Sequence, residues 1–127
     1  MTLCLPVDRV VWINRRVLLP HEWHVMLDQA KLEGALGRPL HTFGPFVAFP
    51  TVPLRAAVLM DGVAQAHAFV DGNKRTAFAS AAMYLRAKGY PLRSMSAEES
   101  GGVVLALTNN RMTTSQVAEW ILENQEA

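Results

Sequence analysis

Apolar residues recur at helical spacing along the chain, and the first two such clusters lie in its N-terminal third. The segment PVDRVVWINRRVL places Val7, Val10, Val11 and Asn14 at helical spacing after a proline, which predicts a short first helix. Asp28 is suited to cap the segment QAKLEGAL, and a glycine followed by a proline supplies its end. Residues 38–53 then combine four prolines, a glycine and three phenylalanines, so we expect a packed loop or flap there.

Two longer apolar segments flank the polar stretch HAFVDGNKRTAF. The first, LRAAVLMDGVAQAHAF, carries apolar residues on one helical face and leads directly into His67. Its apolar positions are Leu54, Val58, Leu59, Val63 and Ala66. The second, TAFASAAMYLRAKGYP, ends with cations, a glycine and a proline, which is a strong helix ending. Its predicted apolar face consists of Phe78, Ala82 and Leu85.

Two further helices are predicted near the C-terminal end, each preceded by a capping signal. Ser96 with Glu99 forms one Ser-x-x-Glu box, and Thr113 with Gln116 repeats the device. The apolar residues that follow are Val103, Val104 and Leu107, and then Val117, Trp120 and Ile121. Since neither a strand pattern nor an internal repeat interrupts this order, we predict a single all-α domain over residues 1–127.

Composition narrows the classes of function. The net charge of the 127 residues is +1 and the charged fraction is 18%, which argues against a broad basic surface for nucleic acid. Cys4 is the only cysteine, so no internal disulfide forms, and a small structural cysteine is the preferred interpretation. The N-terminal residues show neither a membrane-spanning run nor a signal-peptide core, which predicts a cytoplasmic protein without membrane contact.

The polar stretch places Asn73, Lys74 and Arg75 in the first turn of the second flanking helix. A helix N-terminus carries free N–H groups and a partial positive charge, and Gly72 lets backbone approach a bulky anion. Two cations sit poorly at that positive end unless something negative is bound. This conflict favours a phosphate site.

Asp71 and His67 add further chemistry to the same turn. Asp71 can cap the helix, but a carboxylate beside phosphates is also what Mg²⁺ requires. His67 can accept a proton near neutral pH. A histidine cap, an Asp-Gly-Asn turn and a solvated Lys-Arg pair are the ordinary interpretations of the single features. Their coincidence between two apolar helices favours a site for nucleotide-dependent group transfer.

These residues resemble the Fic/Doc family, whose pattern is His-x-Phe-x-(Asp/Glu)-Gly-Asn-(Gly/Lys)-Arg. The chain matches it without a gap at His67, Phe69, Asp71, Gly72, Asn73, Lys74 and Arg75. The resemblance implies a compact helical bundle with the active-site loop between two central helices, and the use of ATP and Mg²⁺ to modify a protein hydroxyl. It implies the following roles: His67 as general base, Phe69 as core anchor, Asp71 as metal ligand, and Gly72, Asn73, Lys74 and Arg75 as the phosphate-binding residues.

Lys74 points to the Doc branch of that family, because members with glycine there typically transfer AMP. The resemblance implies a toxin kinase that phosphorylates a target such as a threonine of elongation factor Tu and so blocks translation. The family's inhibitory motif, Ser/Thr-x-x-x-Glu-Gly/Asn, is not intact: Ser115 and Glu119 have the spacing, but Trp120 follows. We therefore expect a separate antitoxin, whose amphipathic helix would occupy a hydrophobic groove.

Other interpretations stay open. AMP transfer by the same site is the alternative reaction, and a family member that only binds a partner is another. The segment TTSQVAEWILENQ resembles the first helix of a helix-turn-helix, which gives a nucleic-acid-binding module as an alternative of another class. HEWH, residues 21–24, lacks the zincin spacing, so we expect surface or packing roles for His21, His24 and His41.

Overall fold

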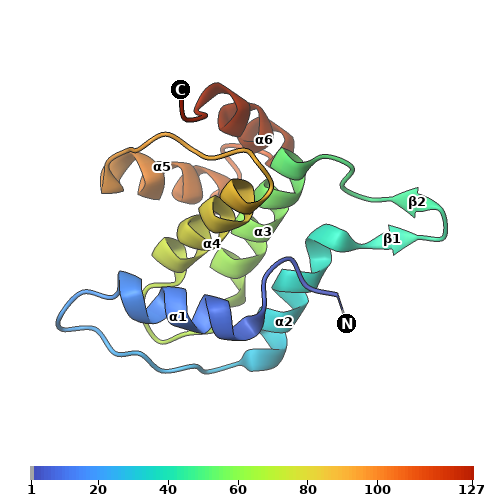
Figure 1. Cartoon of the computed structure of the whole chain (residues 1–127). Helices are drawn as coiled ribbons and strands as arrows, with labels where there is room; N and C mark the ends of the chain where they lie inside the picture. The colour runs from blue at the N-terminus through green and yellow to red at the C-terminus, as the bar shows by residue number, and fades with distance from the viewer. Residues whose placement is uncertain (1) are drawn as a thin grey trace.

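The computed structural model describes residues 2–127, which fold into helices and one small hairpin (Figure 1). In chain order the elements are α1 (Val7–Val17), α2 (Gln29–Gly37), the 3₁₀-helix η1 (Arg38–Leu40), β1 (Thr42–Phe43), β2 (Phe46–Val47), α3 (Val52–Ala66), α4 (Asn73–Ala87), α5 (Ala97–Thr108) and α6 (Thr114–Glu123). The predicted all-α class is confirmed.

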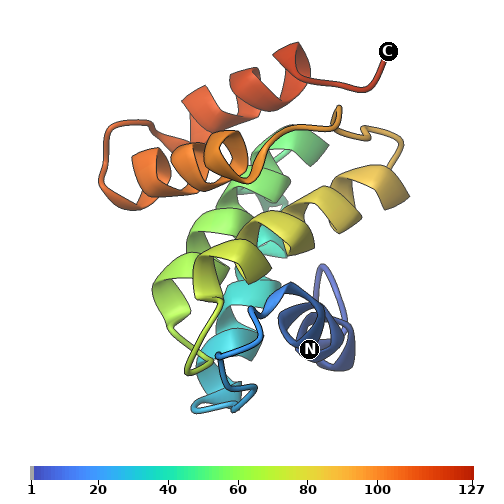
Figure 2. The ribbon, with the colours of Figure 1, turned by 90° about the vertical axis from the view of Figure 1, so that its left-hand side faces the viewer.

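The central helix is α3, which packs against α2, α4, α5 and α6. Its five consecutive residues from Ala56 to Met60 are fully buried, so the helix is covered nearly all round. Thr51 caps its first turn by accepting a hydrogen bond from the backbone N–H of Leu54 at 3.3 Å. Helix α4 lies beside α3, and residues 67–72 join the two at one end of the molecule (Figures 1 and 2).

The buried face of α4 agrees with the predicted one at Leu85, which is fully buried, and differs from it elsewhere. Ala77, Ala81 and Tyr84 are nearly inaccessible, whereas Phe78 and Ala82 are only partly buried. Helices α3 and α4 pack against each other, and both carry fully buried alanines. The prediction assigned the face by the spacing of Phe78, Ala82 and Leu85, and the observed face is rotated from it towards Ala77, Ala81 and Tyr84.

Local capping follows the sequence in most places. Asp28 Oδ1 accepts from the backbone N–H of Lys31 at 3.0 Å, and Thr113 with Gln116 forms the full reciprocal box. The box at Ser96 is half formed. Ser96 accepts from the N–H of Glu99, but the Glu99 carboxylate pairs with Arg93 at 2.7 Å, since that guanidinium is within reach.

The expectation of a packed loop over residues 38–53 is wrong for its middle part. Residues 42–47 form an antiparallel hairpin that projects from the helices (Figure 1), in which Phe43 pairs with Phe46 and both rings are more than 60% exposed. Gly44 has φ 61°, the backbone that a tight hairpin turn requires at its first central position. Only the base is anchored, by the hydrogen bond from Arg55 Nε to the carbonyl of Phe49 at 2.8 Å.

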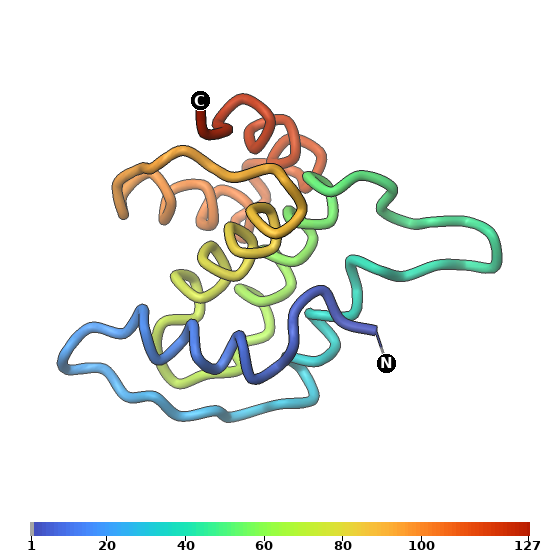
Figure 3. The backbone as a smooth tube through the Cα atoms, viewed as in Figure 1, coloured from blue at the N-terminus to red at the C-terminus, as the bar shows by residue number. Residues whose placement is uncertain are grey.

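The α1–α2 connection, residues 18–28, runs beside the turn between α3 and α4 (Figure 3). The backbone N–H of Val70 donates to the carbonyl of Val25 at 3.0 Å, and that of Leu27 donates to the carbonyl of Ala68 at 2.7 Å. The connection therefore forms one wall of the region that carries the predicted site.

Candidate active site

The active-site turn, residues 67–72, begins and ends at left-handed residues. His67 has φ 46° and ψ 45° at the end of α3, and Gly72 has φ 78° just before α4. Such a backbone is uncommon for a residue other than glycine, so the surrounding contacts must hold His67 in place. The imidazole is exposed, and it is available to a molecule from solution.

The N-terminus of α4 is open to an anion. Gly72 occupies the capping position, and no side chain among residues 2–127 caps the helix. The backbone N–H groups of Asn73, Lys74 and Arg75 are the free donors of the first turn. A hollow of about 310 Å³ in front of them is lined by His67, Gly72, Asn73, Lys74 and Arg75. The structure thus brings together five of the seven residues that the motif predicted.

The side chains of Asn73 and Phe69 hold the turn from inside. Asn73 Oδ1 accepts from the backbone N–H of Phe69 at 3.1 Å, and Asn73 Nδ2 donates to the carbonyl of Phe69 at 2.7 Å. The Phe69 ring is 1% exposed and belongs to the core. These two bonds use one Nδ2 proton and one Oδ1 lone pair of Asn73, and they tie its side chain to the turn.

Asp71 does not cap α4, although the sequence allowed that role. Its Oδ2 accepts from the backbone N–H of Trp23 at 2.9 Å, and its carbonyl accepts from Asn14 Nδ2 at 2.8 Å. The Asp71 side chain bonds to the α1–α2 connection instead, and Gly72, which has no side chain, stands at the capping position. Within residues 2–127 no group of three or more His, Cys, Asp or Glu side chains is gathered as a metal site.

Gly72 is required by the protein's own packing. A Cβ at this position would lie 2.9 Å from Leu18 Cδ2 and 3.3 Å from Asn14 Nδ2. The sequence suggested that the glycine makes room for an anion. The structure shows that α1 and the α1–α2 connection occupy the space next to it.

Arg75 is paired with Glu22, a contact that the sequence did not reveal. The guanidinium and carboxylate form two hydrogen bonds of 2.7 Å, and Arg75 Nη1 also donates to the carbonyl of Val17 at 2.7 Å. The hydrogen bond from Arg75 lowers the pKa of Glu22 from 4.5 to about 2, and the same bond raises the pKa of Arg75. Lys74 is exposed and makes no ion pair with another residue of the range 2–127.

His24 packs behind the turn, in keeping with the packing role expected for this residue. Its ring stacks on Phe69 with 6.1 Å between centroids, and its Nδ1 lies 2.8 Å from Asn14 Oδ1. Burial, with a smaller effect of the charge on Arg15, lowers the pKa of His24 and favours the neutral ring.

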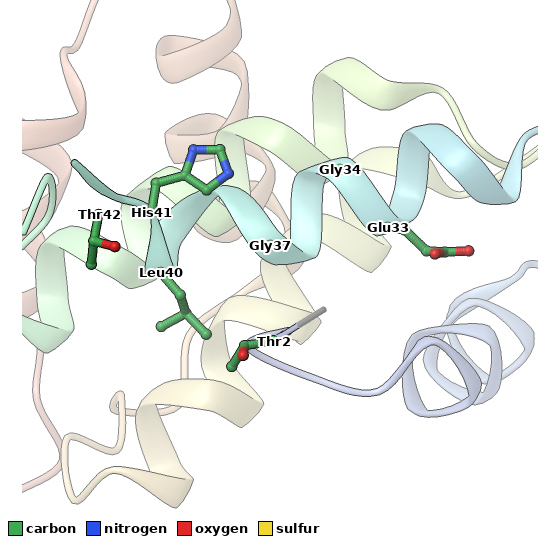
Figure 4. A pocket seen from close by; sticks show the side chains of 7 residues that line it. All are labelled: Thr2, Glu33, Gly34, Gly37, Leu40, His41 and Thr42. Carbon is green, nitrogen blue, oxygen red and sulfur yellow. The ribbon is translucent and has the colours of Figure 1, made fainter. Parts of the chain in front are cut away.

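A second hollow, of about 340 Å³, lies over α2 and η1 (Figure 4). Its two groups with acid–base chemistry, Glu33 and His41, lie at opposite ends of the hollow. They are not arranged to act on one bound atom, so the hollow at α4 is the better candidate for chemistry.

An exposed imidazole and two cations line a hollow at a helix N-terminus that no side chain of residues 2–127 caps, which makes this turn a candidate site for an anion such as phosphate. Residues 4–85 match the model of the Fic/DOC family, and the chain belongs to this family. It is 42% identical over 65 residues to "Toxin Doc" from Mycolicibacterium smegmatis (strain ATCC 700084 / mc(2)155). That alignment covers 51% of this chain and 50% of the relative, so the chain matches about half of the relative's length. No helix within residues 2–127 is long and apolar enough to cross a membrane.

Proposed function

We propose that the chain is a Doc-like toxin that transfers a phosphate from ATP to a hydroxyl side chain of a target protein. The observation that carries this proposal is the hollow at the uncapped N-terminus of α4, where His67 and Lys74 face the same space. The name of the M. smegmatis relative supports the toxin assignment.

The phosphate groups would be bound by backbone and side-chain donors together. The free N–H groups of Asn73, Lys74 and Arg75 point along the axis of α4 and offer partial positive charge. The Lys74 ammonium adds a full charge at the rim of the hollow. Arg75 uses three of its five N–H donors on Glu22 and Val17, so its remaining donors can serve an outer phosphate.

His67 is proposed as the general base. It would take the proton of the target hydroxyl while the hydroxyl oxygen bonds to the terminal phosphorus and the bond to the ADP oxygen breaks. The imidazole, at the end of α3, and the N-terminus of α4 both line the hollow, so both would face a phosphate bound there.

Asp71 fits a role towards Mg²⁺. Its Oδ2 is held by the N–H of Trp23, which fixes the carboxylate and leaves Oδ1 without a hydrogen bond from residues 2–127. Mg²⁺ is commonly bound in proteins by one or two carboxylates together with substrate phosphates and water, so a single carboxylate is sufficient here. When bound, the ion would neutralise charge on the phosphate oxygens.

Lys74 favours phosphate transfer over AMP transfer. A lysine side chain at this position crowds the anion hollow and adds a charge, which changes how a triphosphate is seated. AMP transfer remains the alternative reaction of the same site. A non-catalytic protein- or nucleic-acid-binding module remains the alternative of another class.

A cognate antitoxin is the proposed regulator, since the inhibitory motif is not intact in the chain. An amphipathic antitoxin helix needs an apolar surface, and the exposed Phe43 and Phe46 of the hairpin offer one. The site of action would be the cytoplasm, with elongation factor Tu as the first target to examine.

The test is intact-mass analysis of elongation factor Tu and other candidate proteins after incubation with the chain, ATP and Mg²⁺. We expect a gain of one phosphate, whereas a gain of AMP would select the alternative reaction. His67→Ala should abolish transfer and retain ATP binding, because the base acts on the attacking hydroxyl. Asp71→Asn should weaken the dependence on Mg²⁺. No gain on any protein would favour the binding module.

A further inference from the structure

Asn14 is an unusual residue for the inner side of α1, because its polar side chain is completely buried. A buried amide is costly unless its hydrogen-bonding groups have partners. Here Asn14 Nδ2 donates to the carbonyl of Asp71 at 2.8 Å and to Thr76 Oγ1 at 3.0 Å. Its Oδ1 lies 2.8 Å from His24 Nδ1.

These three partners come from three parts of the fold. Asp71 belongs to the active-site turn, Thr76 to the first turn of α4, and His24 to the α1–α2 connection. The two donations fix which atom of the Asn14 amide is Nδ2 and which is Oδ1. Since Oδ1 can only accept, His24 Nδ1 must carry the proton of the bond between them. The Asn14 side chain therefore also selects one form of the neutral His24 ring.

The contacts lie directly behind the proposed phosphate site. Asp71 and Thr76 bracket Gly72 and Asn73, whose backbone begins α4. Asn14 Nδ2 would lie 3.3 Å from a Cβ at Gly72, so the amide also abuts the left-handed residue itself. A shift of this side chain would move the N–H groups that face the hollow.

We propose that Asn14 is a positioning residue, which sets the active-site turn and the first turn of α4 through its bonds to Asp71 and Thr76, with His24 fixing its orientation. The rate readout of this inference rests on the proposed transfer reaction. The geometric readout does not, since it is measured on the protein without ligand.

The main variant is Asn14→Leu, which keeps a similar volume and removes all three hydrogen bonds. We expect the transfer rate at saturating ATP to fall by about 100-fold, the effect of a displacement of about 1 Å at a reacting centre. In the ligand-free ¹⁵N-labelled protein, the amide signals of Gly72 and Asn73 should shift and their hydrogen exchange should accelerate.

The matched control is Val10→Ala, which removes buried volume from the same helix and touches none of these bonds. Val10→Ala should lower the melting temperature about as much as Asn14→Leu does. It should leave the transfer rate and the amide signals of Gly72 and Asn73 near their wild-type values. A conservative pair adds a second check. His24→Asn keeps a donor near the position of Nδ1 and should retain the rate, whereas His24→Leu should lose it.

A wild-type rate and unchanged turn amides in Asn14→Leu would overturn the inference, and so would an equal loss in Val10→Ala. If Asn14→Leu does not fold, Thr76→Val removes one partner with little change of shape and should give a smaller effect of the same kind. If the wild-type protein transfers nothing, the proposed function fails, but the amide measurements still decide whether Asn14 sets the turn.

Discussion

Replacing Phe69 by alanine tests whether the active-site turn is anchored in the core. The ring is 1% exposed and packs within the core cluster, with His24 stacked on one side. Loss of a buried aromatic side chain costs about 3–5 kcal/mol of unfolding free energy. A chain of this length is stabilised by about 6–15 kcal/mol, so the variant should still fold. The substitution leaves the hydrogen bonds between the Asn73 side chain and the Phe69 backbone in place. The loss of unfolding free energy therefore measures the packing of the ring.

The assay is equilibrium unfolding in urea, followed by circular dichroism. With a slope of about 1.5 kcal/mol per molar urea, the midpoint should fall by about 2–3 M. The matched control is Phe43→Ala, the same change at a ring that is 67% exposed, which should stay within about 0.5 kcal/mol of wild type. A fall of less than about 0.7 M for Phe69→Ala, or equal falls for both variants, would refute the anchoring role.

Three further outcomes are expected. Because Arg75 lowers the pKa of Glu22 from 4.5 to about 2, the pair stabilises the fold above pH 4.5 and this contribution disappears as the pH falls towards 2. Acid unfolding series of wild type and Glu22→Gln should therefore converge over that range, and a constant difference would contradict the pairing. Burial raises the pKa of the Cys4 thiol from 9.0 to about 11, so alkylation by iodoacetamide at pH 8 should be about 100-fold slower in the native protein than in urea. Gly72→Ala should cost about 1 kcal/mol more in urea unfolding than Gly89→Ala, because both positions are left-handed but only a Cβ at Gly72 meets other atoms within 4 Å.

The helices and their ends were predictable because the signals are local. Asp28 and Thr113 each bond to a backbone N–H three residues ahead, so the cap and its partner lie in one short segment. The hairpin was missed although a turn signal was present, since Gly44 and Pro45 lie between the short segments Thr42–Phe43 and Phe46–Val47. The prolines around Gly44 favoured the interpretation as a loop. The sequence pattern also gives no indication that the rings of Phe43 and Phe46 stay exposed to solvent.

The position of the candidate site along the chain was predictable, but the contacts that support it were not. The motif is continuous, so its members from His67 to Arg75 must lie in one turn. Glu22 and Asn14 contact that turn from 53 and 57 residues away. Those pairings depend on how α1 and the α1–α2 connection pack against α4 and the turn before it. The spacing of residues in the sequence does not predict this packing. The buried Asn14 at an otherwise apolar face was the one available signal.

The long sequence separation of these supports has a consequence for synthesis. A ribosome releases α1 before the active-site turn exists, and at about 5–20 residues per second the 57 residues between Asn14 and Asp71 take about 3–11 s. During that interval Asn14 lacks its partners Asp71 and Thr76, and Glu22 lacks Arg75. The local partners of these side chains, His24 for Asn14 and the N–H of Leu19 for Glu22, are already made. The candidate site therefore gains its long-range supporting contacts late in synthesis, once α4 has emerged from the ribosome.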